Sequence, residues 1–107
     1  MIDQQEILIR VKGVSSVQLD FWVCEHWVRP ARSGNDFAFN EADIARVHLL
    51  HTLNNELEVG EEAIPIILSL IDQLHEMRAH MHTISSAIDT QPEEVRRQIL
   101  EQAKKRL

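Results

Sequence analysis

The chain has 107 residues, which is the size of one small domain, and its formal net charge is -6. A single cysteine excludes an intramolecular disulfide framework and fits a reducing compartment. No apolar run reaches the roughly 20 residues that span a bilayer, and the acidic, polar start is unlike a secretory or transit peptide. We therefore expect a soluble, cytoplasmic protein with no membrane segment.

The acidic charge is concentrated in the middle of the chain. Residues 41–77 carry eight acids and one base, Arg46, and no Lys or Arg occurs between Arg46 and Arg78. Phosphate backbones attract clustered Lys and Arg, so this balance disfavours a nucleic-acid partner.

Two short helices and a hairpin are predicted for residues 3–39. Asp3 and Glu6 form an N-terminal cap pair, and the first helix continues to about Val11, before Lys12 and Gly13. Ser15 with Gln18 predicts a capping box for a second helix, which should end near His26, with Leu19, Trp22, Val23 and Cys24 facing inward. The next segment predicts a strand over Val28 to Arg32, a turn over residues 33–36 and a returning strand at Phe37 to Phe39.

A third helix and a long fourth helix follow. Asn40 with Asp43 caps the third helix, whose apolar positions recur at three and four residues as far as Leu57. We expect Gly60 to cap the fourth helix, with Glu61 and Glu62 in its first turn, and Pro65 to remove one helical hydrogen bond and bend it. The apolar positions of the fourth helix form a heptad seam: Ala63, Ile67, Leu70, Leu74, Met77, Met81, Ile84 and Ile88.

This heptad seam has two interpretations. Its first half can pack on the chain's own helices while only the second half protrudes. Alternatively, its second half is a homodimer contact, antiparallel or parallel, through Leu74, Met77, Met81, Ile84 and Ile88. We favour self-association, because a small domain would otherwise expose a long apolar seam. A final helix, with a cap at Thr90 to Glu93, should run to about Lys105.

No pattern of catalytic or metal-binding residues emerges. None of the six histidines makes the i, i+4 pair with a carboxylate that zinc hydrolases use, and Cys24 lies in an apolar helix without a base. The chain also lacks a glycine-rich phosphate loop, a G-x-S-x-G motif and any tyrosine. We therefore expect that the protein is not an enzyme and that it binds no metal, cofactor or small-molecule substrate.

The acids of the middle segment form the main candidate binding surface. Six of them should lie around one helix–helix corner without a basic neighbour: Glu56, Glu58, Glu61, Glu62, Asp72 and Glu76. A charged face of this kind is either an ordinary solvated surface or a patch that steers a basic protein surface toward it.

The N-terminal pattern resembles the winged helix-turn-helix of MerR-type regulators. The matching segments are G-V-S-S-V-Q-L-D-F-W, V-R-P-A-R and S-G-N-D-F-A-F-N-E-A-D-I, and the likeness covers roughly residues 2–88. Recognition helices of that class carry arginines, where this chain has Val17, Asp20 and Cys24. An aspartate facing phosphate repels it. The remaining basic positions are Arg10, Lys12, Arg29 and Arg32.

The chain more closely resembles the CbpM chaperone-modulator family, whose small MerR-like members lack the usual DNA-reading residues. The likeness rests on V-S-x-x-x-L from Val14, V-x-P from Val28, F-x-F-N-E-A-D from Phe37, and L-x-x-E-L-E-V-x-x-x-x-I from Leu53. The following I-I-L-S-L-I-D-Q-L-H-E-M is similar to the family's long helix. This resemblance implies a protein that binds and inhibits the J-domain of a DnaJ-type co-chaperone, which presents a basic helix.

These observations predict a mainly α protein with a MerR-like winged helix-turn-helix, a small two-stranded β wing and a long C-terminal heptad helix. The predicted parts are a winged domain over residues 1–59, the long helix over 60–89 and a C-terminal helix over 90–107. The first functional hypothesis is a non-enzymatic modulator that binds a DnaJ-type J-domain through the acidic corner. The alternatives are a MerR-type DNA-binding transcriptional regulator and a dimeric interaction module with an unrelated partner.

Overall fold

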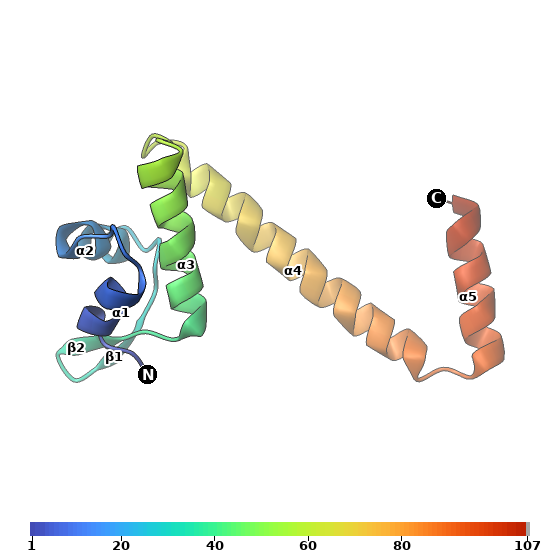
Figure 1. Cartoon of the computed structure of the whole chain (residues 1–107). Helices are drawn as coiled ribbons and strands as arrows, with labels where there is room; N and C mark the ends of the chain where they lie inside the picture. The colour runs from blue at the N-terminus through green and yellow to red at the C-terminus, as the bar shows by residue number, and fades with distance from the viewer. Residues whose placement is uncertain (107) are drawn as a thin grey trace. The chain divides into compact units, whose positions relative to one another are not determined.

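The computed structural model describes residues 1–106 and shows a mainly helical chain with one two-stranded antiparallel sheet in that range (Figure 1). The elements, in chain order, are α1 (Gln4–Arg10), α2 (Ser16–Cys24), β1 (Ala31–Ser33), β2 (Asp36–Ala38), α3 (Glu41–His51), the π-helix η1 (Thr52–Glu56), α4 (Ile64–Asp89) and α5 (Glu93–Arg106). The chain forms two compact units, Met1–Leu68 and Ser69–Leu107, and their boundary falls inside α4. The sequence instead suggested edges near residues 59 and 89.

Local caps start the first three helices where the sequence predicts them. The Asp3 carboxylate accepts a hydrogen bond from Glu6 N at 2.8 Å, and Ser15 Oγ accepts one from Gln18 N at 3.1 Å. Asn40 and Asp43 form a complete, reciprocal capping box at the start of α3. The box predicted at Ser15 is only half made, because the Gln18 amide donates to Asn55 Oδ1 at 2.7 Å.

The hairpin begins later than predicted. Val28 is part of the core, and its N–H donates to Trp22 O at 3.3 Å, so the strand pairing starts only at Ala31. Gly34 has φ +66° in the two-residue turn, as a type II′ turn requires at its first central position. Phe39 lies beyond β2 and pairs with Ile2 in an isolated antiparallel bridge, so the N-terminus is tied to the hairpin.

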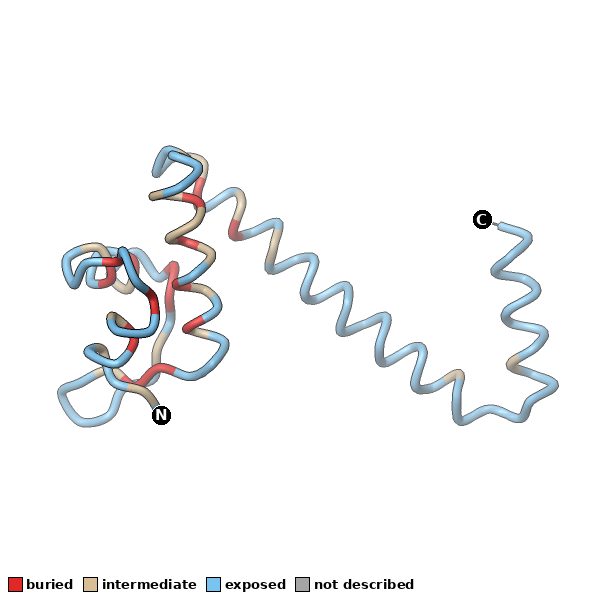
Figure 2. Tube along the Cα trace, in the orientation of Figure 1, coloured by how far each residue is buried: buried red, intermediate tan, exposed pale blue. Residues whose placement is uncertain are grey.

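One hydrophobic cluster holds the first unit together. It includes side chains from α1, α2, the hairpin and α3, and the first turn of α4 completes it through Ile64 and Leu68 (Figure 2). Its largest fully buried members are Trp22, Phe39, Ile7, Leu19, Leu50, Ile64, Val11, Val28 and Val47. The prediction that Cys24 faces inward is wrong, since Cys24 is exposed at the last residue of α2.

The third helix does not continue to Leu57 as an α-helix. It changes at Thr52 into η1, where Leu57 N donates to Thr52 O at 2.9 Å across five residues. The wider turn shifts the following residues around the axis. Leu53 is therefore buried, but Leu57 is 64% exposed, which corrects its expected place in the apolar face.

The fourth helix also begins later than predicted. Glu61 and Glu62 lie in the turn before it, because α4 starts at Ile64. Pro65 falls in its first turn, where a backbone N–H has no intrahelical partner, so it removes no helical hydrogen bond. The expected loss of a helical hydrogen bond at Pro65 is therefore wrong. The fully buried positions of its first turns are Ile64 and Leu68, whereas Ala63 and Ile67 are half-buried.

The second unit contains the remainder of α4 and α5, and most of its residues are exposed (Figure 2). The hydroxyl of Thr90 donates to Ala87 O at 2.7 Å, so it closes the end of α4 rather than capping α5 as predicted. Pro92 O accepts from Arg96 N at 3.0 Å and starts α5. No helix among the described residues is long and apolar enough to cross a membrane.

Candidate protein-interaction site

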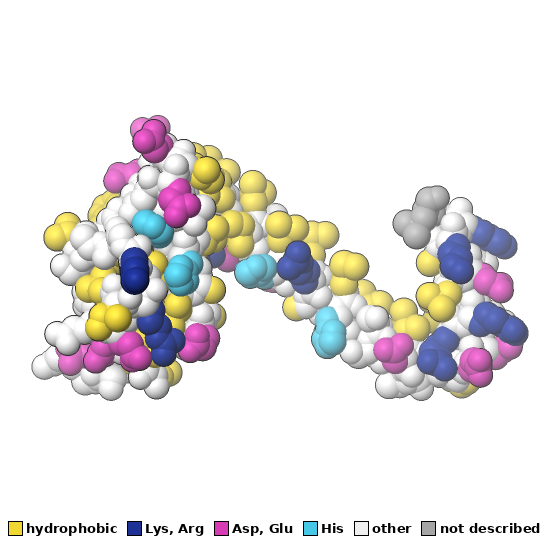
Figure 3. All heavy atoms as spheres, viewed as in Figure 1, with side chains coloured by type: hydrophobic (Ala, Val, Ile, Leu, Met, Phe, Trp, Pro, Cys, Tyr) yellow, Lys and Arg dark blue, Asp and Glu magenta, His cyan; other side chains and the backbone are white. Residues whose placement is uncertain are grey.

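Four of the six predicted acidic contacts lie together in the segment that runs from the last residue of η1 to the turn before α4. We call residues 56–62 the acidic loop; its acids are Glu56, Glu58, Glu61 and Glu62, all exposed. Acidic side chains gather at this end of the first unit in Figure 3. The two other predicted contacts, Asp72 and Glu76, lie one turn apart on α4 in the second unit.

The acidic loop is attached to the core at its middle residue, Val59. Val59 is half-buried against the hydrophobic cluster, and its N–H donates to Leu53 O at 2.8 Å. Glu58 has φ +53°, a left-handed conformation that an L-residue rarely adopts outside a constrained turn. The loop therefore presents its carboxylates from a defined backbone.

A polar network joins η1 to the turn between α1 and α2. The Asn55 amide donates to Gly13 O at 3.1 Å, and its nitrogen lies 2.8 Å from His51 Nδ1. Gln18 donates to the other end of the same amide. His51 Nε2 in turn lies 3.6 Å from the Glu56 carboxylate, so the network ends at the acidic loop. Asn55 could not be identified from the sequence, because a π-helix has no recognisable spacing of residue types.

The four basic residues assigned to the DNA alternative do not form one free patch. Arg10 lies between two carboxylates, with nitrogen–oxygen distances of 3.3 Å to both Glu6 and Glu41. Arg29 Nε donates to His26 O at 3.2 Å, and the Arg32 guanidinium lies 5.1 Å from the centre of the Phe37 ring. Lys12 is exposed in the turn after α1.

One exposed face of α2 consists of three apolar side chains and one aspartate. We call it the α2 face, and its members are Val17, Asp20, Phe21 and Cys24. Val17 is 77% exposed, and the helix contains no Lys or Arg. The amide of Gln4 on α1 donates to Asp20 Oδ1 at 3.0 Å, which holds this carboxylate beside the N-terminal end of α1.

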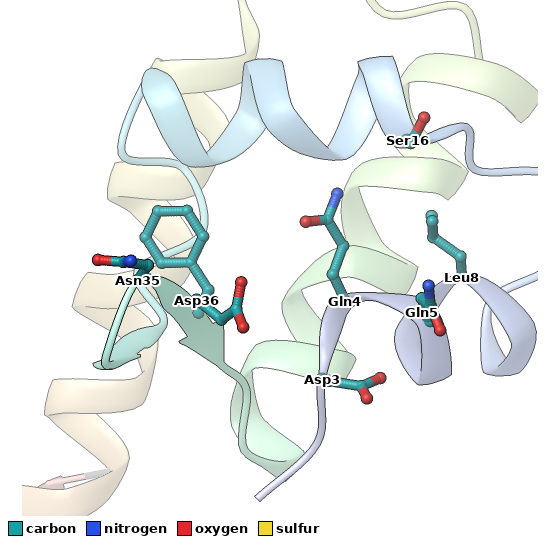
Figure 4. Close-up of a pocket in the computed structure, with 8 residues that line it drawn as sticks. Asp3, Gln4, Gln5, Leu8, Ser16, Asn35 and Asp36 are labelled. Atoms are coloured by element: carbon teal, nitrogen blue, oxygen red, sulfur yellow. The ribbon is translucent and has the colours of Figure 1, made fainter.

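A groove of about 710 Å³ opens beside the α2 face. We call it the hairpin groove; it is lined by Asp3, Gln4, Gln5, Leu8, Ser16, Asn35, Asp36 and Phe37. Figure 4 shows Gln4 extending from α1 toward α2 and the Asp36 side chain lying at the hairpin. Its charged lining residues are two aspartates, so the groove is acidic. Residues far apart in the sequence form it, and sequence analysis did not identify it.

The predicted dimer seam is largely exposed on α4. Leu74 is 56% exposed, Met77 62%, Met81 67% and Ile84 59%. Leu70, one turn before Leu74, is also 56% exposed. Ile88, the last member, is half-buried. Hydrophobic side chains line α4 in Figure 3. One alternative is that the chain's own helices cover the first half of the heptad seam. This applies only to the first turns of α4, because the seam is exposed from Leu70 onward.

Within residues 1–106, no three His, Cys, Asp or Glu side chains are grouped closely enough to hold a metal ion. No family model, no curated protein and no solved structure matches the chain. The surfaces that bear on function are the acidic loop, the α2 face, the hairpin groove and the α4 stripe, which consists of Leu70, Leu74, Met77, Met81 and Ile84.

Proposed function

We propose that this chain is a cytoplasmic, non-enzymatic chaperone modulator that binds the J-domain of a DnaJ-type co-chaperone and inhibits it. The scaffold would be a MerR-like winged helix-turn-helix, with α1 and α2 joined by the Gly13 turn and the β1–β2 hairpin as its wing. Two observations support this: the CbpM-like motifs, and the order of helix, helix, hairpin, helix and long helix.

The acidic loop is the observation that carries the proposal. Glu58, Glu61 and Glu62 are exposed and accept no hydrogen bond from a Lys or Arg among the described residues. The first unit as a whole has eleven acids and five bases, a net charge of -6. A basic J-domain helix would be attracted to this unit, and the attraction would be strong at low salt and screened within about 8 Å at physiological ionic strength.

The DNA-binding alternative is less well supported by the same surfaces. Arg10 is already neutralised by two carboxylates, and the α2 face would bring Asp20 toward phosphate. If this alternative were correct, the purified protein would shift duplex DNA with a steep salt dependence, and Asp20→Arg would strengthen the shift. We expect no such shift at physiological salt.

Homodimerisation through α4 is part of the proposal. Fully burying an exposed Leu, Ile or Met side chain contributes about 1.5–3 kcal/mol. The residues at positions 70, 74, 77, 81 and 84 are 56–67% exposed, so burying the exposed part of these ten side chains in two copies would supply about 9–18 kcal/mol. Association costs about 4–15 kcal/mol, so the stripe is large enough to favour a dimer. The flanking charges, such as Arg78 and Glu76, do not select an orientation of the two helices.

The proposal is tested by calorimetric titration of the full chain with a DnaJ-type J-domain at low salt. We expect binding that weakens at least tenfold when Glu58, Glu61 and Glu62 are all changed to Lys. The control makes the same change in net charge at three exposed acids of the second unit: Asp89→Lys, Glu93→Lys and Glu101→Lys. No binding by the unmodified chain, or equal loss in the two triple variants, contradicts the proposal.

A further inference from the structure

We infer that the α2 face and the hairpin groove together form a docking surface for a basic amphipathic helix, and that this surface receives the J-domain helix. The inference rests on the proposed function, and it names a contact surface separate from the acidic loop. Its partner is defined by chemistry: a helix with an apolar stripe flanked by Lys or Arg.

The apolar half of the surface is the stripe that Val17, Phe21 and Cys24 form at i, i+4 and i+7 along α2. These spacings place the three side chains in one row. Phe21 is 38% exposed although its ring packs edge-on against Trp27, with ring centres 5.6 Å apart. That contact fixes the exposed ring in one orientation. A fixed apolar row two turns long fits the ridge of another helix.

The polar half of the surface is acidic and adjoins the stripe. Asp20 lies between the apolar stripe and the hairpin groove, because it belongs to the α2 face and accepts a hydrogen bond from Gln4, which lines the groove. Across the groove, Asp36 is exposed at the hairpin turn and has no ion pair with a described base. Asp3 is the third acid. A helix whose apolar row rests on α2 would therefore place flanking cations near three carboxylates.

Charge selects this occupant over nucleic acid. The charged residues that line the groove are carboxylates, and α2 has no cation. Arg32 lies over the ring of the lining residue Phe37, but one cation beside three carboxylates leaves the surface acidic, so a phosphate backbone entering here would meet net repulsion. An uncharged apolar helix would offer these carboxylates no ion-pair partner. The basic amphipathic helix satisfies both halves.

The test uses the full chain, a DnaJ-type J-domain and a synthetic 15-residue amphipathic helical peptide with a leucine row flanked by lysines. The principal variants are Val17→Ser and Asp36→Lys, which change exposed side chains and leave the core intact. Ile9→Ser is the matched control for the apolar change, because Ile9 is 74% exposed on α1. Asp89→Lys is the matched control for the charge change.

We expect the Val17→Ser/Asp36→Lys double variant to bind the J-domain and the peptide at least tenfold more weakly, and the paired controls to change binding less than twofold. Backbone amide chemical-shift changes should be centred on residues 16–24 and 34–37. J-domain binding that is unaffected by the double variant, with shifts confined to residues 56–62, overturns this inference and leaves the proposed function standing. If the J-domain does not bind the unmodified chain, the proposed function is overturned, and the docking surface is then tested with the peptide alone. The inference is overturned if the peptide does not bind, or if it binds the double variant as tightly as the unmodified chain.

Discussion

The ring of His51 lies directly against Gly13, so closely that a Cβ added to Gly13 would be 2.7 Å from His51 Cε1. Gly13 also has φ +95°, a backbone conformation that side-chain-bearing residues rarely adopt. This contact brings the α1–α2 turn to the end of α3, where the polar network of Asn55 begins.

Gly13→Ala should therefore destabilise the first unit. Strain from the backbone and the close ring contact should lower the free energy of unfolding by about 1–3 kcal/mol, measured by urea denaturation. Gly60→Ala is the control, because its new Cβ meets nothing within 4 Å. Equal stability of the two variants would contradict the role assigned to the His51–Gly13 contact.

Removing the Asn55 amide should weaken the attachment of η1 to the α1–α2 turn. Asn55→Ala leaves Gly13 O and the Gln18 amide without their partner, and we expect a loss of about 1–3 kcal/mol. Hydrogen exchange should accelerate at residues 52–59 more than at α1. Gln73→Ala, which removes an exposed amide on α4, should leave both measurements unchanged.

The register of η1 predicts that alanine substitution lowers the free energy of unfolding strongly at Leu53 and very little at Leu57, four residues later. Leu53→Ala should cost about 2–5 kcal/mol, because Leu53 is 8% exposed. Leu57→Ala should change the free energy of unfolding by less than about 0.5 kcal/mol, because Leu57 is 64% exposed. Thermal and urea denaturation of the two variants distinguish this register from a regular α-helix, in which both substitutions would be costly.

The contribution of the α2 cap to stability can be measured by comparing alanine substitutions at the neighbouring residues Ser15 and Ser16. Ser15→Ala removes the hydroxyl that accepts from Gln18 N, and it should cost about 1 kcal/mol of stability. Ser16 is the first residue of α2 and lines the hairpin groove, so Ser16→Ala should cost less than half as much. A larger loss for Ser16→Ala would show that the cap is not the stabilising group.

Acidic substitutions in the α4 stripe should produce a monomer. Met77→Glu with Met81→Glu places four charges in a dimer seam, and sedimentation analysis should show at least a tenfold weaker self-association. The control, Ala79→Glu with Ser86→Glu, adds the same charge on the side of α4 away from the heptad seam. Because Met77 and Met81 are already exposed, the circular dichroism of both variants should match the unmodified chain. An unmodified chain that is monomeric at all concentrations would contradict the dimer.

Short-range chemistry made much of the fold predictable. The caps at Asp3, Ser15 and Asn40 each depend on a donor three residues away, so their residue types and spacing are visible in the chain. The turn at Gly34 and the apolar spacing of α4 are local in the same sense. The acids of the loop were predicted, since charge is a property of composition.

What could not be predicted depends on contacts between distant segments. The register changes after Thr52, in the segment where Asn55 bonds to Gln18 and to Gly13 O, 37 and 42 residues away, and Leu57 lies in solvent. The division of the acids between two units depends on where α4 leaves the core, after Leu68.

The sequence by itself determined the starts of the first three helices, the hairpin turn, the acidic charge and the apolar stripe of α4, because each arises from neighbours within a few residues. Only the tertiary structure decided that Arg10 is held by Glu6 and Glu41, that Cys24 faces outward, and that α1, α2 and the hairpin enclose an acidic groove. Those features require elements far apart in the chain to be packed on one core, which local periodicity does not encode.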